Sequence, residues 1–291
     1  MFHDDRATSC DSCPSRRADS FSASLKASGM ASRATKISFN SSAGPISALV
    51  SEPRARVEAA PPLLALHGIS RDVEETFDAF RPAANEAGRV LIAPEFSRKS
   101  WRVFQRITDR TRPDIALLEV LTMLRDADVI DRRPLDVFGF SGGAQLAHRW
   151  AMLYPHMVAS LHISSAGWYT SPQADAPYPY GLQCSDPSEK DEAWRRHMAR
   201  GLDAFLRLPI NIYVGEKDNI EEDAALRRNA VLDAAQGCER RMRARTYHDA
   251  LLAAAKARNI EPAIKFHELL GCGHSFAQCA RSGGLVKHLL R

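Results

Sequence analysis

The sequence predicts a single α/β domain in which a mostly parallel central sheet is flanked by helices. Three observations lead to this class. The chain has 291 residues, of which 45% are hydrophobic and 25% charged, a balance typical of globular proteins. Short, wholly apolar runs recur along it, as expected of strands buried on both faces of a parallel sheet. Helical patterns separate several of these runs, which predicts right-handed βαβ units.

The first 34 residues differ from the rest of the chain. They contain 8 of the 25 serines and show no apolar period, so we expect a disordered tail at 1–34 and a domain at 35–291. Ser15-Arg16-Arg17 is a weak candidate for a twin-arginine export signal. Cys10 and Cys13 form an isolated CxxC pair, which is weak evidence for a redox or zinc role.

Composition excludes several classes of function. A balance of 39 Lys and Arg against 35 Asp and Glu gives a net charge of +4, too small to favour a nucleic-acid partner. No stretch approaches 18 consecutive apolar residues, so we expect no membrane span and no membrane partner. Six cysteines suggest free thiols in a reducing compartment, which predicts a cytoplasmic protein. The weak export signal leaves secretion open, and the oligomeric state is not predicted.

The predicted strands follow from apolar runs and turn residues. Gly44-Pro45 separates the first two strands, which we expect to form a hairpin. The other strands are short runs without charged residues in their centres. The eight expected strands span residues 36–40, 46–50, 62–66, 89–93, 135–138, 158–163, 210–214 and 264–269.

The predicted helices lie between these strands. In the clearest one Thr111 is the expected cap, Pro113 fits the first turn, and Leu117, Leu121 and Leu124 line one face. Further helices are expected at residues 142–153, 191–206 and 276–290. Two connections are long, at 168–208 and 219–262, and we expect the first to form a small lid-like insertion.

The central motif is Gly139-Phe140-Ser141-Gly142-Gly143. It follows a predicted strand and opens a predicted helix, so the chain must turn sharply at Ser141. Glycines on both sides leave room for that turn and for close packing of helix and strand. The serine hydroxyl is therefore expected at the carboxyl end of the strand, where the helix dipole favours negative charge. We predict that Ser141 is a nucleophile.

A serine nucleophile needs a base. His274 lies in a glycine-flanked loop just after the last predicted strand, and we assign it this role. His148 falls on the helix after Ser141, whereas His162 and His267 fall within strands, so we interpret these three as structural.

The base in turn needs a carboxylate that accepts its N–H and fixes its tautomer. Asp218 follows the strand at 210–214 and precedes His274, and we favour it for this position. Four acidic neighbours are rivals for the role: Glu216, Glu221, Glu222 and Asp223.

Acyl transfer also needs N–H donors for the developing oxyanion. The Gly142 N–H is one expected donor. In His67-Gly68-Ile69-Ser70, directly after a strand, Gly68 allows the backbone to turn and directs the Ile69 N–H toward the same point. Ser70 and its neighbour Arg71 are candidates for contact with a substrate carboxylate, although a solvated Arg71 is the simpler expectation.

These motifs, in this order, resemble the α/β-hydrolase fold family over residues 36–291. Leu66-His67-Gly68-Ile69-Ser70-Arg71 and Ser164-Ser165-Ala166-Gly167-Trp168-Tyr169 are similar to the serine esterase branch that includes polyhydroxybutyrate depolymerases and feruloyl esterases.

The resemblance implies a serine hydrolase that cleaves a small-molecule carboxylic ester through an acyl-enzyme. The expected site consists of Ser141, Asp218, His274, the Ile69 and Gly142 N–H groups, and Ser70, Trp168 and Tyr169 in the substrate pocket. It implies no metal and no organic cofactor.

Three alternatives stay open at this point. A thioesterase or a peptidase would use the same residues, and a non-catalytic binding protein would keep the fold. Cys272 and Cys279 flank His274, but neither spacing matches a usual zinc-ligand pair.

Overall fold

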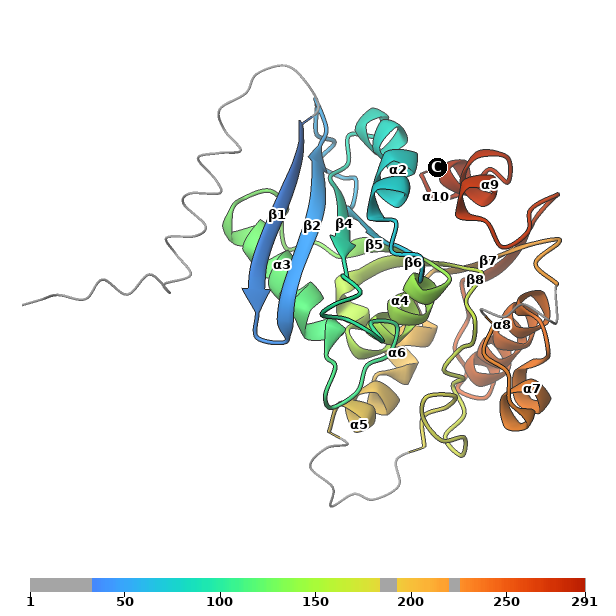
Figure 1. Cartoon of the computed structure of the whole chain (residues 1–291). Helices are drawn as coiled ribbons and strands as arrows, with labels where there is room; N and C mark the ends of the chain where they lie inside the picture. Colours follow the sequence, from blue (N-terminus) through green and yellow to red (C-terminus); the bar gives the residue numbers. More distant parts are fainter. Residues whose placement is uncertain (1–32, 184–192, 220–225, 291) are drawn as a thin grey trace, which may run out of the picture.

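The computed structural model describes residues 33–183, 193–219 and 226–290 (Figure 1). The tail expected at 1–34 falls almost wholly outside these residues, together with Cys10, Cys13 and the candidate export signal. The first strand begins at Arg33, two residues before the expected start of the domain.

One eight-stranded sheet forms the centre of the molecule (Figure 1). Its strands lie in the order β1-β2-β4-β3-β5-β6-β7-β8, and β2 pairs antiparallel with both neighbours, while all later pairs are parallel. The predicted α/β class with a mostly parallel sheet is therefore confirmed. The strands are β1 Arg33–Ser41, β2 Gly44–Glu52, β3 Leu63–Leu66, β4 Leu91–Glu95, β5 Leu135–Phe140, β6 Val158–Ser164, β7 Ile210–Gly215 and β8 Ile264–Leu269.

Helices cover both faces of the sheet and bury one apolar cluster against each (Figure 1). On one face lie α2 Val73–Glu86, α9 Phe276–Arg281 and α10 Leu285–Leu289. On the other lie α3 Pro113–Asp126, α4 Gly142–Leu153, α5 Ala193–Arg200, α6 Leu202–Leu206 and α8 Arg240–Lys256, with α7 Ala230–Gln236 packed against α8. All twelve residues of α4 are buried.

The strand at 89–93 was placed two residues too early. Arg89 belongs to the preceding loop, where its Nε donates to Pro61 O at 2.7 Å and its guanidinium pairs with Asp136. These bonds satisfy a nearly buried cation just before β4 begins.

The structure corrects three helix predictions. Thr111 does not cap α3; it pairs with Thr108 across a β-bridge, and Arg112 occupies the N-cap position without a side-chain cap bond. The helix expected at 276–290 is broken before α10, because Gly284 adopts a φ of 70°. The helix expected at 191–206 is divided at Gly201, into α5 and α6.

Three helices were not expected at all, namely α2, α7 and α8. The signal for α2 is local, because Asp72 accepts the Glu75 N–H at 2.7 Å and so caps the first turn. The burial of Val73, Phe77 and Phe80 then follows helical spacing.

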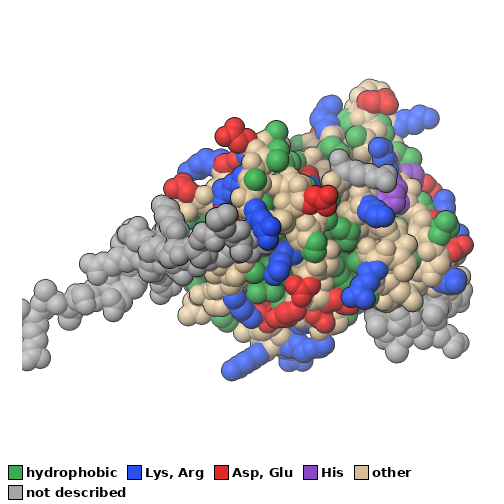
Figure 2. Space-filling model, turned by 90° about the horizontal axis from the view of Figure 1, so that it is seen from above, with side chains coloured by type: hydrophobic (Ala, Val, Ile, Leu, Met, Phe, Trp, Pro, Cys, Tyr) green, Lys and Arg blue, Asp and Glu red, His purple; other side chains and the backbone are tan. Residues whose placement is uncertain are grey.

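No helix in the described ranges is both long and apolar enough to cross a membrane. On the face shown in Figure 2, acidic side chains are set among the basic ones.

The turn from β5 into α4 depends on two glycines. A Cβ on Gly139 would lie 2.4 Å from the carbonyl carbon of Gly143, and a Cβ on Gly143 would lie 2.3 Å from Leu66 O. Both separations are far inside van der Waals contact, and both neighbours are backbone atoms that cannot rotate away. The start of α4 therefore lies directly against the ends of β3 and β5.

We predict that Gly143→Ala lowers the free energy of unfolding by about 3 kcal/mol or more, because the new methyl group must displace the backbone of β3. Urea denaturation of the purified protein measures this change. The matched control is Gly273→Ala, whose Cβ would meet nothing closer than 3.9 Å. Equal unfolding midpoints for the two variants would contradict the packing argument.

Candidate active site

Ser141 stands at the turn between β5 and α4 in a strained backbone conformation. Its φ of 51° and ψ of −112° are sparsely populated by residues with a side chain. The conformation is held by two hydrogen bonds, from the Ser141 N–H to Ser164 O at 2.8 Å and from the Gln145 N–H to Ser141 O at 3.2 Å. The serine side chain is left at the N-terminus of α4, close to the helix N–H groups.

His274 lies in the loop between β8 and α9, with its Nε2 3.1 Å from the Ser141 hydroxyl. Its ring stacks on Phe140 at a centroid distance of 5.2 Å and an angle of 24°. Ser275 ends the loop, because its side chain accepts the Gln278 N–H and so caps α9. The imidazole is therefore held both by its ring contact and by the start of a helix.

Asp218 follows β7 and lies on the other side of the imidazole. Its Oδ2 is 2.9 Å from His274 Nδ1, and its Oδ1 is 3.5 Å from a guanidinium nitrogen of Arg240. A carboxylate only accepts, so Nδ1 of the histidine must donate. The neutral ring then presents an unprotonated Nε2 to the serine hydroxyl, as a base requires.

The rivals of Asp218 are arranged differently. Glu216 accepts the Gly271 N–H at 2.8 Å and so ties the loop after β7 to the loop after β8. Glu221, Glu222 and Asp223 lie outside the described residues. Arg240 was not anticipated, because it reaches Asp218 from the start of α8, a helix that the sequence pattern did not predict.

The histidines interpreted as structural all have other partners. His148 is fully buried, and its ring nitrogens lie at Ala144 O and at the Thr170 N–H. His162 contacts Ser160 and Tyr213, and His267 contacts Asn211.

Two backbone N–H groups meet beside Ser141. A Cβ on Gly142 would lie 3.4 Å from Ile69 N, so the two backbone segments are in contact. Within the described ranges, neither the Ile69 nor the Gly142 N–H donates to another protein group. This pair is the geometry in which an oxyanion would find two donors.

His67 fixes the loop that carries Ile69. The Phe96 N–H donates to its Nε2 at 3.0 Å, so that nitrogen carries no proton, and Nδ1 donates to Gly68 O at 2.8 Å. The ring is fully buried, and burial lowers the pKa of His67 from 6.5 to about 4. A neutral histidine therefore clamps Gly68 to the chain that follows β4.

A cavity of about 220 Å³ opens over Ser141. Ser70 and Trp168 line it as expected, whereas Tyr169 is buried and stacks on Tyr247 at 4.3 Å. The sequence reasoning missed several of its residues; Gln145, one helical turn after Ser141, could have been found from helix periodicity. Besides Ser70 and Trp168, the lining residues are Gly68, Ile69, Glu75, Gln105, Phe140, Ser141, Gly142, Gln145, Gly167, Arg227, Arg240, His274 and Phe276.

Arg71 is partly exposed, but its guanidinium is also held by protein groups, which the simpler expectation of a solvated side chain did not include. Its guanidinium lies over the ring of Phe104 at 4.7 Å and donates to three carbonyl oxygens, those of Phe96, Ser97 and Arg102. These contacts close the loop beside the cavity and occupy the side chain.

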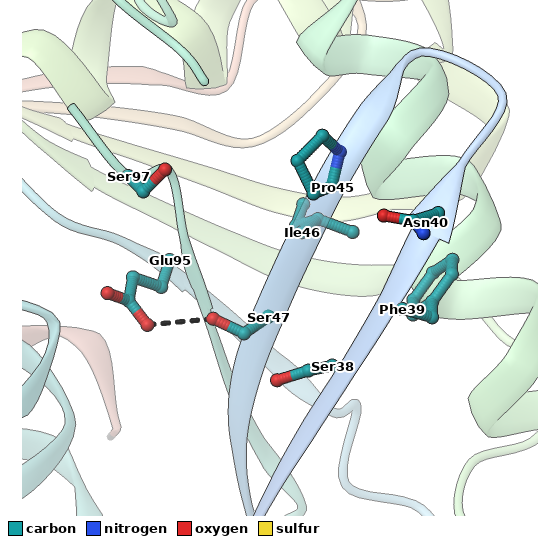
Figure 3. Close-up of a pocket in the computed structure, with 8 residues that line it drawn as sticks. All are labelled: Ser38, Phe39, Asn40, Pro45, Ile46, Ser47, Glu95 and Ser97. Atoms are coloured by element: carbon teal, nitrogen blue, oxygen red, sulfur yellow. Dashed lines mark hydrogen bonds between the residues drawn. The ribbon is translucent and has the colours of Figure 1, made fainter. Parts of the chain in front are cut away.

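A larger hollow, of about 520 Å³, lies on the β1–β2 hairpin beside the end of β4 (Figure 3). Its single charged lining residue, Glu95, points toward Ser47 and accepts its hydroxyl at 2.7 Å. Lys36 pairs with the same carboxylate. No histidine or cysteine lines this hollow, so it offers neither a serine–histidine nor a cysteine–histidine pair.

The cysteines beside His274 do not form a metal site in the described structure. Cys272 and Cys279 are buried thiols, and burial raises the pKa of Cys279 to about 12. Across the described ranges, no group of three or more His, Cys, Asp or Glu side chains could hold a metal ion.

Comparison with known proteins identifies the fold. No family model and no curated protein matches the sequence. Solved structures that are similar include poly(aspartic acid) hydrolase-1 from Sphingomonas sp. KT-1, with a TM-score of 0.75 and 23% identity over 90% of this chain and 100% of that one.

Two further examples show the same similarity. A poly(3-hydroxybutyrate) depolymerase from Bordetella parapertussis has a TM-score of 0.74 and 23% identity over 92% of each chain. An S-formylglutathione hydrolase from Agrobacterium tumefaciens has a TM-score of 0.57 and 17% identity over 90% of this chain and 95% of that one. The chain therefore has the α/β-hydrolase fold.

We predict that the protein loses stability as the pH falls from about 6.5 to about 4, because the unfolded chain takes up protons that His67 in the folded state does not. A pKa difference of this size corresponds to about 3 kcal/mol. Urea denaturation at pH 7 and at pH 4.5 measures the loss.

The variant His67→Asn removes this titrating group, so its free energy of unfolding should depend less steeply on pH. His156→Asn, at an exposed position, is the matched control and should keep the wild-type slope. An unchanged slope in His67→Asn would show that the ring does not stay neutral when buried.

Proposed function

We propose that the protein is a serine hydrolase that cleaves carboxylic esters through an acyl-enzyme. The observation that carries the proposal is the hydrogen-bonded series from Asp218 through His274 to Ser141, which ends beside two N–H groups without protein partners among the described residues. Acyl transfer requires a hydroxyl nucleophile, a base, a carboxylate that orients the base, and two hydrogen-bond donors for the oxyanion.

In the first half of the reaction, Ser141 Oγ attacks the ester carbonyl carbon while His274 Nε2 accepts the hydroxyl proton. The carbonyl oxygen becomes an oxyanion, and the Ile69 and Gly142 N–H groups stabilise it by several kcal/mol. Asp218 stabilises the positive charge that forms on the imidazole. The intermediate then collapses, and His274 returns the proton to the departing alcohol.

In the second half, water attacks the carbonyl carbon of the ester formed with Ser141. His274 accepts a proton from the water, and the same two N–H groups stabilise the second oxyanion. Ser141 leaves and is reprotonated by the imidazole, so the free acid is released and the site is restored. No step of the proposed reaction requires a metal or an organic cofactor.

Esters are favoured as the substrate class, with thioesters and peptides as the alternatives that the same residues could serve. The similar structures are described as a poly(3-hydroxybutyrate) depolymerase, a poly(aspartic acid) hydrolase and an S-formylglutathione hydrolase, and the first of these names a polyester. A panel of short-chain, long-chain and feruloyl esters with matching thioesters would rank these classes. We also propose that residues at about 168–208, which contribute Trp168 to the cavity, act as a lid.

Ser141→Ala should abolish both covalent labelling by a fluorophosphonate and hydrolysis of p-nitrophenyl acetate, because the attacking oxygen is lost. Mass spectrometry of the labelled peptide and a spectrophotometric assay measure the two effects.

Ser165→Ala is the matched control, since Ser165 also follows a strand of the sheet and has a φ of 50°. It should keep the label and the activity. Turnover by Ser141→Ala at the wild-type rate would overturn the assignment of the nucleophile.

Asp218→Asn should lower kcat by about 10⁴, because an amide in place of the carboxylate favours the wrong imidazole tautomer. Steady-state kinetics with p-nitrophenyl acetate measures the change. Glu216→Gln should retain activity, since its amide oxygen can still accept the Gly271 N–H. If Glu216→Gln is inactive and Asp218→Asn is not, the orienting carboxylate has been assigned to the wrong residue.

A further inference from the structure

The wall of the cavity over Ser141 contains a tryptophan surrounded by cations. The guanidinium carbons of Arg106, Arg149 and Arg227 lie 5.1, 5.6 and 5.4 Å from the ring centroid of Trp168. The indole itself is only 4% exposed. We call these four residues the Trp168 cluster. Each guanidinium lies within the distance at which a cation interacts with an aromatic ring.

Arg149 is fully buried and has only neutral partners. Its Nε donates to Thr170 Oγ1 at 2.8 Å, and one Nη donates to the carbonyl oxygens of Gln105 and Gln145 at 2.7 and 3.0 Å. The other Nη has no partner among the described residues. Burial lowers the pKa of Arg149, yet a guanidinium keeps its proton in proteins. A buried cation without a carboxylate is costly, and a nearby anion would offset that cost.

Arg227 brings a second cation to the open side of the cavity. It lies in the connection between β7 and α7, lines the cavity and is exposed to solvent. Its guanidinium also lies 5.9 Å from the ring of Tyr180. Neither Arg227 nor Arg106 forms a salt bridge with a carboxylate in the described ranges, and Arg106 Nε is buried without a partner there.

Further polar atoms in the same wall are buried and unpartnered. These atoms are Oε1 of Gln105, Oε1 of Gln145 and Nε1 of Trp168. None of them has a hydrogen-bond partner among the described residues. Buried polar groups are nearly always hydrogen-bonded. Of these three atoms only the Trp168 Nε1 carries a proton, so it is the one that could donate to an acidic ligand, which only accepts. The one carboxylate in the lining, Glu75, comes from α2 and also lines the hollow beside Phe276; within the described ranges no salt bridge joins it to an arginine of the cluster.

We infer that the Trp168 cluster binds a carboxylate of the substrate, so that the preferred substrate is an ester with a free carboxylate on its acyl chain. Arg227 would contact the carboxylate directly, because a guanidinium fork matches its two oxygens. Arg149 would not touch the carboxylate but would attract it electrostatically, because a charge buried in the protein is little screened by solvent. This inference rests on the proposed ester hydrolysis at Ser141 and names the substrate class for that site.

The test compares two esters with acyl chains of equal length, 4-nitrophenyl hexanoate and mono-4-nitrophenyl adipate. The measured quantity is the ratio of kcat/KM for the adipate ester to that for the hexanoate ester. In the wild type we expect the ratio to exceed one and to fall as salt is added, since salt screens the attraction. In Arg227→Gln it should fall by about tenfold or more, with most of the salt dependence lost.

Two matched variants sharpen this comparison. Arg227→Lys keeps the charge without the fork and should recover part of the ratio. Arg102→Gln removes an exposed arginine that does not line the cavity, and should leave the ratio and the activity as in the wild type. Thermal unfolding establishes that each variant is folded. An Arg227→Gln variant that is folded and keeps the wild-type ratio would overturn the inference.

A binding experiment separates this inference from the proposed function. Free glutarate is titrated calorimetrically into Ser141→Ala, where no turnover is needed. Binding that Arg227→Gln weakens about tenfold supports the subsite, and no binding overturns it. If the wild type hydrolyses neither ester and no fluorophosphonate label reaches Ser141, the proposed function fails instead.

Discussion

The contact between α4 and the strands β3 and β5 is the constraint on which the candidate site depends. Gly139 and Gly143 allow backbone to meet backbone there, at separations that leave no room for a methyl group. Because the helix starts so close to the sheet, the chain has to reverse within one residue. That residue is Ser141, and its positive φ is the cost of the close contact. The position of the hydroxyl is thus a consequence of packing in the centre of the molecule.

The parallel sheet then brings the remaining groups to the same edge. Ile69 follows β3, Asp218 follows β7 and His274 lies in the loop after β8, so these residues, far apart in sequence, all come from carboxyl ends of parallel strands of one sheet. Buried polar contacts fix each loop separately, as His67 does for the loop of Ile69. The scaffold supplies the approximate positions, and these local bonds supply the orientation.

The sequence predicted those parts of the structure that depend on residues close together along the chain. The Ser141 turn follows from its glycines, and the strands follow from their apolar runs. Arg240 and Arg227 could not be found in this way, because they approach the cavity from a long connection whose helices carry no strong periodic pattern. Thr111 shows the converse, since a residue with good capping chemistry pairs with Thr108 instead. For Thr111, pairing within its own turn took precedence over helix capping.

The hydrogen bond from Gly271 to Glu216 has a mechanical consequence for the base and its carboxylate. Together with the backbone bond from the Lys217 N–H to Cys272 O at 2.8 Å, it links the two segments that carry Asp218 and His274, so movement of one segment relative to the other would break hydrogen bonds. The distance of 2.9 Å between the Asp218 carboxylate and the His274 imidazole is therefore kept when both loops move together relative to the sheet. An engineered insertion in one of the two segments would have to be matched by a change in the other, because the hydrogen bond between them would otherwise be lost.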